Sequence, residues 1–83
     1  MNITEEQKQE ADRIVSRYKY LYDVIHTEVD AIRCAIQDRQ SVLEENKSML
    51  EMIKLHGTER IRMPLLDRIQ SLTNQIEYLK TKI

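Results

Sequence analysis

The feature that most constrains this chain is a seven-residue repeat of apolar side chains that runs from Ala11 to Ile53 without a Gly or Pro. Apolar residues alternate at intervals of four and three, interrupted only by Arg39 and Asn46. A period of 3.5 residues that is sustained over this length is typical of a supercoiled helix. The whole chain of 83 residues holds one Gly and one Pro, so we expect an all-α fold.

A second heptad register runs from Leu65 to Ile83 and is out of phase with the first. The shift falls in "HGTERIRMP", where Gly57 suits the end of a helix and Pro64 the first turn of the next. We therefore predict an antiparallel helical hairpin with coiled-coil heptads. It consists of a long helix over about 5–56, a turn at 57–63 and a short helix over about 64–83.

The start of the long helix carries "TEEQ" at Thr4 to Gln7, a capping-box signature. A three-helix bundle with a break near residue 40 is the alternative, because "SVLE" from Ser41 is a second possible capping box. The unbroken heptad favours one helix. At this length we expect a single domain over residues 1–83.

The two arms of this hairpin are unequal, so the short helix would leave the apolar residues before about residue 36 uncovered. A large exposed apolar surface favours association, and we predict that the chain assembles with itself into an oligomeric helical bundle. The predicted interface consists of Ala11, Ile14, Val15, Tyr18, Leu21, Tyr22, Ile25, Val29, Ile32 and Ile36.

The middle of the long helix is apolar on its other side as well, in and after the stretch "YKYLYDVIH". Tyrosine is favoured at protein interfaces, because its ring is buried while its hydroxyl finds a partner. The predicted second apolar face consists of Tyr20, Val24, Ala31 and Cys34. We interpret Arg39 and Asn46 as polar residues that set the register of the seam.

Enzymatic chemistry is not expected, because the chain has no Gly-rich phosphate loop and no nucleophile with a base beside it. Cys34 lies two turns from His26, and we predict a packed structural thiol. Asp23, His26 and Asp30 share one helix side but lie outside the seam, so we expect no metal and no cofactor.

Basic residues favour one alternative function, the binding of nucleic acid or a nucleotide along a row of cations on the bundle. Interspersed acids and a net charge of −1 favour pairing within the protein instead. The possible anion-binding residues are Lys19, Arg33, Lys47, Lys54, Arg60 and Arg62.

The overall prediction is a non-enzymatic protein-protein interaction module that binds itself and a partner protein, as a small adaptor, chaperone-like factor or inhibitor. No apolar run is long enough to span a membrane, and the start is polar rather than signal-like. A single Cys permits no internal disulfide. We therefore expect a cytoplasmic protein with no membrane partner.

Overall fold

The computed structural model describes residues 3–20, 27–56 and 59–83. These residues form three α-helices and one short 3-10 helix, in the order α1 (Glu5–Lys19), α2 (Glu28–His56), η2 (Glu59–Ile61) and α3 (Arg62–Lys80). The described residues form no strand, so the predicted all-α class is confirmed.

The capping box predicted at the start of α1 is present. The Gln7 backbone N–H donates to the Thr4 hydroxyl at 3.1 Å, and the Thr4 backbone N–H donates to the Gln7 side-chain oxygen at 3.2 Å. Glu5 and Glu6 occupy the first turn, where negative charge is stabilised by the helix dipole. The start of α1 was therefore correctly predicted from the sequence.

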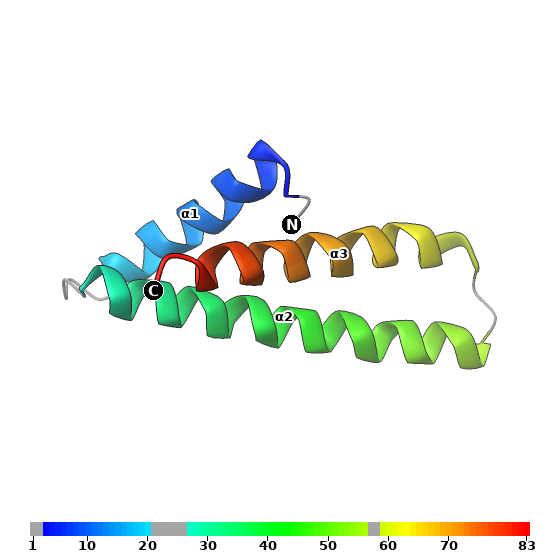
Figure 1. Ribbon diagram of the computed structural model, residues 1–83. Helices are drawn as coiled ribbons and strands as arrows, with labels where there is room; N and C mark the ends of the chain where they lie inside the picture. Colours follow the sequence, from blue (N-terminus) through cyan, green and yellow to red (C-terminus); the bar gives the residue numbers. More distant parts are fainter. Residues whose placement is uncertain (1–2, 21–26, 57–58) are drawn as a thin grey trace.

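α2 and α3 lie side by side and run in opposite directions (Figure 1). Leu43 of α2 and Leu72 and Ile76 of α3 belong to one core cluster. α3 begins at Arg62, two residues before the predicted start, and Pro64 lies in its first turn. Proline is tolerated there because its missing N–H would have no partner within the helix.

The single helix predicted over 5–56 is wrong. α1 ends at Lys19 and α2 begins at Glu28. Thr27 caps α2, since its hydroxyl accepts a hydrogen bond from the Asp30 backbone N–H at 3.1 Å. The alternative, a three-helix bundle with a break near residue 40, has the right number of α-helices for the described residues, but its break is misplaced because α2 is continuous from Glu28 to His56.

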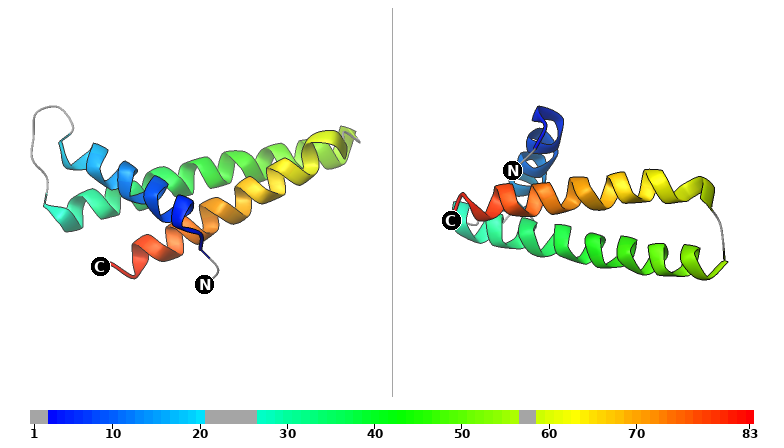
Figure 2. Two further views of the ribbon diagram at one scale, coloured as in Figure 1. Left: turned by 90° about the horizontal axis from the view of Figure 1, so that it is seen from above. Right: turned by 45° about the vertical axis from the view of Figure 1, so that its right-hand side comes forward.

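The physical reason for the break is that α1 folds back across one face of the α2–α3 pair (Figure 2). Ala11, Ile14 and Val15 are buried there. Burying an aliphatic side chain contributes about 1.5–3 kcal/mol, whereas each backbone hydrogen bond of an uninterrupted helix adds only about 1 kcal/mol. The other buried members of the core cluster are Ala31, Ile32, Ala35, Ile36, Leu43, Leu72, Ile76 and Leu79.

α1 covers only part of the α2–α3 pair, near the start of α2 and the end of α3 (Figures 1 and 2). We call the opposite part, from Met49 to the end of α2 and from η2 to Arg68 of α3, the uncovered end.

In the described part of the chain, no helix combines the length and the apolar character needed to cross a membrane.

Candidate binding surface

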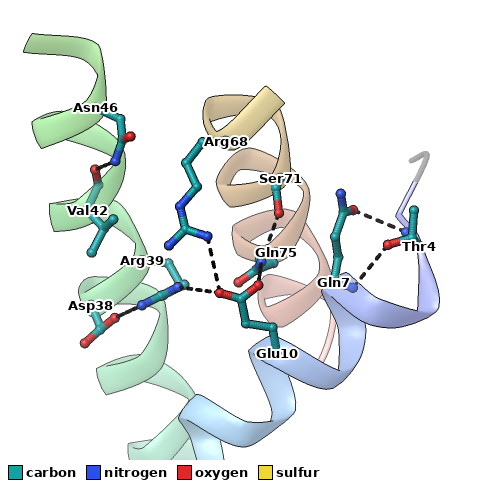
Figure 3. A network of polar contacts seen from close by, with 10 residues as sticks. All are labelled: Thr4, Gln7, Glu10, Asp38, Arg39, Val42, Asn46, Arg68, Ser71 and Gln75. Atoms are coloured by element: carbon teal, nitrogen blue, oxygen red, sulfur yellow. Dashed lines mark hydrogen bonds and ion pairs between the residues drawn. The ribbon is translucent and has the colours of Figure 1, made fainter. Parts of the chain in front are cut away.

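A network of polar contacts centred on Glu10 holds α1 on the other two helices (Figure 3). The Glu10 carboxylate receives the Gln75 side-chain N–H at 3.1 Å and lies 3.4 Å from Arg39 and 3.5 Å from Arg68. One side chain of α1 therefore contacts one side chain of α2 and two of α3. Such a contact fixes the position of α1, because all three partners must be met together.

Arg39 is the buried cation of this network, with 7% of its surface exposed. Its guanidinium also donates to the Asp38 carboxylate at 2.6 and 3.0 Å. The Tyr18 hydroxyl of α1 donates to the same carboxylate at 2.9 Å. A buried charge costs several kcal/mol unless it is paired, and Arg39 has a carboxylate on each side.

These contacts change how Asp38 and Tyr18 titrate. Burial acts to raise the pKa of the Asp38 carboxyl, but the hydrogen bonds from Arg39 and Tyr18 outweigh it and hold this pKa below its ordinary value. The hydrogen bond to Asp38, together with burial, raises the pKa of Tyr18. At neutral pH Asp38 is therefore ionised and Tyr18 is neutral, and in these states the Tyr18 hydroxyl of α1 donates to the Asp38 carboxylate.

A second polar contact lies near the C-terminus of α3. The Asp12 carboxylate of α1 accepts hydrogen bonds from the Tyr78 hydroxyl at 3.0 Å and from the Lys82 ammonium at 2.9 Å. The Lys82 ammonium also lies 4.6 Å from the centre of the Tyr78 ring. The Tyr78 hydroxyl and the Asp12 carboxylate raise the pKa of Lys82.

Sequence reasoning missed this polar interface. Arg68 and Gln75 are seven residues apart on one side of α3, and Lys82 follows at the same spacing just beyond the end of the helix. That spacing was visible in the sequence, but only its apolar counterpart was read as a contact surface. Gln75 is completely buried, and its side-chain oxygen has no hydrogen-bond partner among the described residues.

Cys34 lines a groove of about 350 Å³ between α1 and α2, together with Tyr18 and Asp38. A reactive thiol needs a neighbouring base or cation that favours the thiolate. The Asp38 carboxylate is held by Arg39 and Tyr18 and has a lowered pKa, which makes it a poor base. An unreactive structural thiol at Cys34 stays a prediction.

The described residues show no arrangement suited to a metal ion. No group of three or more His, Cys, Asp or Glu within residues 3–20, 27–56 and 59–83 is positioned to hold one. Of the three metal candidates in the sequence, Asp30 is exposed on α2, and Asp23 and His26 lie outside the described residues.

The residues of the predicted self-association interface differ in their burial within the single chain. Ala11, Ile14, Val15, Ile32 and Ile36 pack against each other within one chain. Tyr18 is half-buried against the same cluster, and Val29 is exposed. Leu21, Tyr22 and Ile25 lie outside the described residues.

The predicted second apolar face is also divided. Ala31 is buried in the core, Cys34 is half-buried and Tyr20 is exposed, while Val24 lies outside the described residues. Of the two polar residues in the seam, Arg39 pairs across to α1. The Asn46 side chain instead donates to the Val42 carbonyl of its own helix at 2.7 Å (Figure 3).

The basic residues predicted as an anion site do not form one continuous cationic row. Lys19 pairs with Glu28 at 3.6 Å, Lys47 with Glu44 at 4.0 Å and Lys54 with Glu51 at 3.5 Å. Each pair places an acid beside the cation, which reduces the local attraction for phosphate. The remaining three, Arg33, Arg60 and Arg62, are exposed.

The most unusual surface is the uncovered end, where five large apolar side chains are exposed. Leu55 is 81% exposed, Met63 63%, Met52 59%, Met49 49% and Ile61 47%. Exposed apolar residues are ordinary when they are scattered singly, whereas contiguous apolar patches are typical of interaction sites. Of these five side chains, Met49 and Ile61 line one groove. The sequence analysis missed this surface because the interface that it predicts ends at Ile36.

Comparison with known proteins adds no relative. Neither a scan of protein-family models nor searches of curated proteins and of solved structures gave a match to this chain.

Proposed function

We propose that this chain is a non-enzymatic protein-binding module that binds a partner protein through its uncovered end. The observation that supports this proposal is the cluster of exposed apolar side chains on α2, η2 and α3. A small protein that exposes such a cluster in water gains free energy when a partner covers it. The docked α1 acts as a brace that holds α2 and α3 in place.

The remaining features of the proposal follow from this surface. The paired heptads of α2 and α3 favour an antiparallel coiled-coil hairpin as the rigid part of the module. A module of this kind acts by occupying a partner's surface, as an adaptor, chaperone-like factor or inhibitor. A cytoplasmic location belongs to the same proposal.

The test is binding by variants that place charge on the uncovered end. The full chain is used to capture partners from cells, and the captured partner is then purified and titrated with Met52→Glu/Met63→Glu. We expect at least a tenfold loss of affinity, because both carboxylates would be buried in the complex without a counter-charge. The matched control is Gln40→Glu/Ser41→Glu, which adds the same charge to exposed positions elsewhere on α2.

An equal loss of affinity in both double variants would show that the effect is due to net charge, and the proposal that the uncovered end binds the partner would lose its support. Both variants should keep the helical circular dichroism of the parent, since all four positions are exposed. A partner whose affinity is unchanged by Met52→Glu/Met63→Glu would refute the proposal.

Self-association is a second proposal, and it is weaker than the sequence pattern suggests. Most described residues of the predicted interface are buried within one chain, but Tyr20 and Val29 are still exposed beside the connection between α1 and α2. A second copy is therefore proposed to pack there. Light scattering should give a mass of at least twice 9.9 kDa, and Val29→Glu should return it to the monomer mass; a monomeric parent would exclude this proposal.

A further inference from the structure

The uncovered end contains a groove of about 280 Å³ between α2 and α3, lined by Met49, Ile61, Pro64, Leu65 and Arg68. We infer that this groove binds an acidic amphipathic helix of a partner protein, on the face of the α2–α3 pair that also carries α1. The inference rests on the proposed function and specifies the kind of partner. Its support comes from the continuity of the groove with the α1 contact.

Arg68 belongs to both the α1 contact and the groove. Its guanidinium lies 3.5 Å from Glu10 of α1, and its side chain is also part of the groove wall. Arg68 and Gln75 of α3 contact α1, and Lys82, seven residues after Gln75 and just beyond the end of α3, contacts it as well. Ile61, seven residues before Arg68, is the last residue of η2 and lines the groove.

The same continuity holds on α2. Ala35 is buried in the core, Val42 packs against the core cluster, and Met49 is the next residue at this spacing and lines the groove. Two rows of side chains that already hold one helix therefore continue into an open groove. A groove of this form accepts the apolar side of an amphipathic helix, whose anchors recur at i, i+3, i+4 and i+7.

The groove residues are suited to such a ligand. Met49 lines the groove, and Met52 is exposed three residues further along α2. Methionine is unbranched and polarizable, so it adapts to differently shaped apolar anchors. Arg68 is about half exposed, and a guanidinium has five N–H donors, so a second carboxylate can reach it from the groove.

A second copy of this chain fits the groove less well. Two uncovered ends placed together would bring Arg68 and Arg60 of both copies into one contact, which like-charge repulsion disfavours. A stable dimer also buries about 800 Å² on each partner, from about 20 or more residues. The uncovered end comprises 18 described residues, 49–56 and 59–68, and only five of them line the groove.

The test uses the full chain labelled with ¹³C at the methionine methyl groups, which gives separate reporters at Met49, Met52 and Met63. The probe is a synthetic amphipathic helix of about 18 residues with Leu on one side and Glu on the other. We expect it to shift the Met49 resonance in a saturable manner, while a scrambled peptide of the same composition does not. A version with Lys in place of Glu should bind at least several-fold more weakly.

Variants locate the site. Met49→Glu, followed at the Met52 resonance because the Met49 reporter is lost, should weaken binding of the acidic peptide about tenfold or more, equivalent to about 1.4 kcal/mol. Ser48→Glu, at the neighbouring exposed position of α2, should have little effect. Arg68→Gln should reduce the preference for the acidic over the basic peptide. Ile61→Glu provides a second groove variant at an exposed position, so the test does not depend on one substitution.

Three results would overturn the inference. The first is that the acidic peptide leaves the Met49 methyl resonance unshifted. The second is that this resonance shifts with protein concentration alone, which would indicate binding of a second copy. The third is that it shifts only when vesicles of phosphatidylserine and phosphatidylcholine are added. If Met52→Glu/Met63→Glu abolishes partner binding but the peptide leaves Met49 unshifted, the proposed function stands and the helical partner fails. If neither effect is seen, both fail.

Discussion

The covered half and the uncovered end of the α2–α3 pair distribute polarity in opposite ways. Under α1 the facing side of α3 is polar, with Arg68, Gln75 and Lys82 meeting the carboxylates of Glu10 and Asp12. At the uncovered end the same side of the pair is apolar and exposed, at Ile61 and Met49. The covered half thus combines a buried apolar core with polar side chains that are paired, whereas the uncovered end has apolar side chains that are exposed.

This difference separates two ways of holding a helix. α1 is covalently attached, so its contact needs specificity more than affinity, and a polar network supplies a defined position. A partner from solution must also overcome the loss of translational and rotational freedom, and apolar surface supplies that free energy. This difference is therefore expected if one half of the face serves an internal helix and the other half an external one.

The comparison is tested most strongly by removing one leucine from each region. Leu72→Ala, at a completely buried position under α1, should lower the free energy of unfolding by about 2–5 kcal/mol, because it removes buried methyl groups and leaves a cavity. Leu55→Ala, at the most exposed leucine of the uncovered end, should change it by no more than about 0.5 kcal/mol. Urea denaturation of both variants measures the difference; similar losses would mean that the uncovered end is part of the core in solution.

The polar network should show the next largest effect. Glu10→Ala leaves the buried Arg39 with Asp38 as its only carboxylate in the network, and we expect a loss of about 1–2 kcal/mol, less than for a fully broken buried pair. The control is Glu44→Ala, which removes an exposed partner of Lys47 at 4.0 Å and should cost under about 0.5 kcal/mol. Equal losses in thermal or urea unfolding would show that the network contributes no more than a surface ion pair.

The sequence was sufficient for the helical class, the capping box at Thr4 and the start of α3 to within two residues. Each depends on local chemistry: helix-forming composition, one cap, and Pro64 in a first turn. The apolar residues buried in the core were also identified, because their spacing marks them. What the spacing could not tell was whether the covering helix belongs to a second copy or to the same chain.

The break between α1 and α2 was missed for a physical reason. The heptad continues through it without a Gly or Pro, and α1 folds back because of tertiary burial, which local sequence does not show. One local signal was present, since Thr27 and Asp30 in "TEVD" match a capping box. The polar network was missed because carboxylates and cations on separate helices reveal no pairing until the helices are placed.

Thr27 offers a smaller test of where α2 begins. Thr27→Ala removes the hydroxyl that accepts the Asp30 backbone N–H at 3.1 Å, and such a cap contributes about 1 kcal/mol. Ser48→Ala, at an exposed interior position of α2, should be neutral or slightly stabilising because alanine is the better helix former. The free energies of unfolding of the two variants are compared; a neutral Thr27→Ala would mean that α2 does not begin at this residue.

The smallest expected effect is a pH dependence confined to the covered half. The pKa of Asp38 is lowered in the folded chain, so its contribution to stability is present above its ordinary value of 3.8 and is lost as the pH falls through the lowered folded value. Asp38→Asn should therefore be less stable than the parent at neutral pH, and the difference should narrow below about pH 4. Asp67→Asn, which removes the same charge from an exposed position near the uncovered end, measures the part that is due to net charge alone. Urea unfolding of the three proteins between neutral and acid pH decides the point: an Asp38→Asn difference that stays constant with pH, or that matches Asp67→Asn throughout, would show that the docking of α1 does not depend on the ionised Asp38.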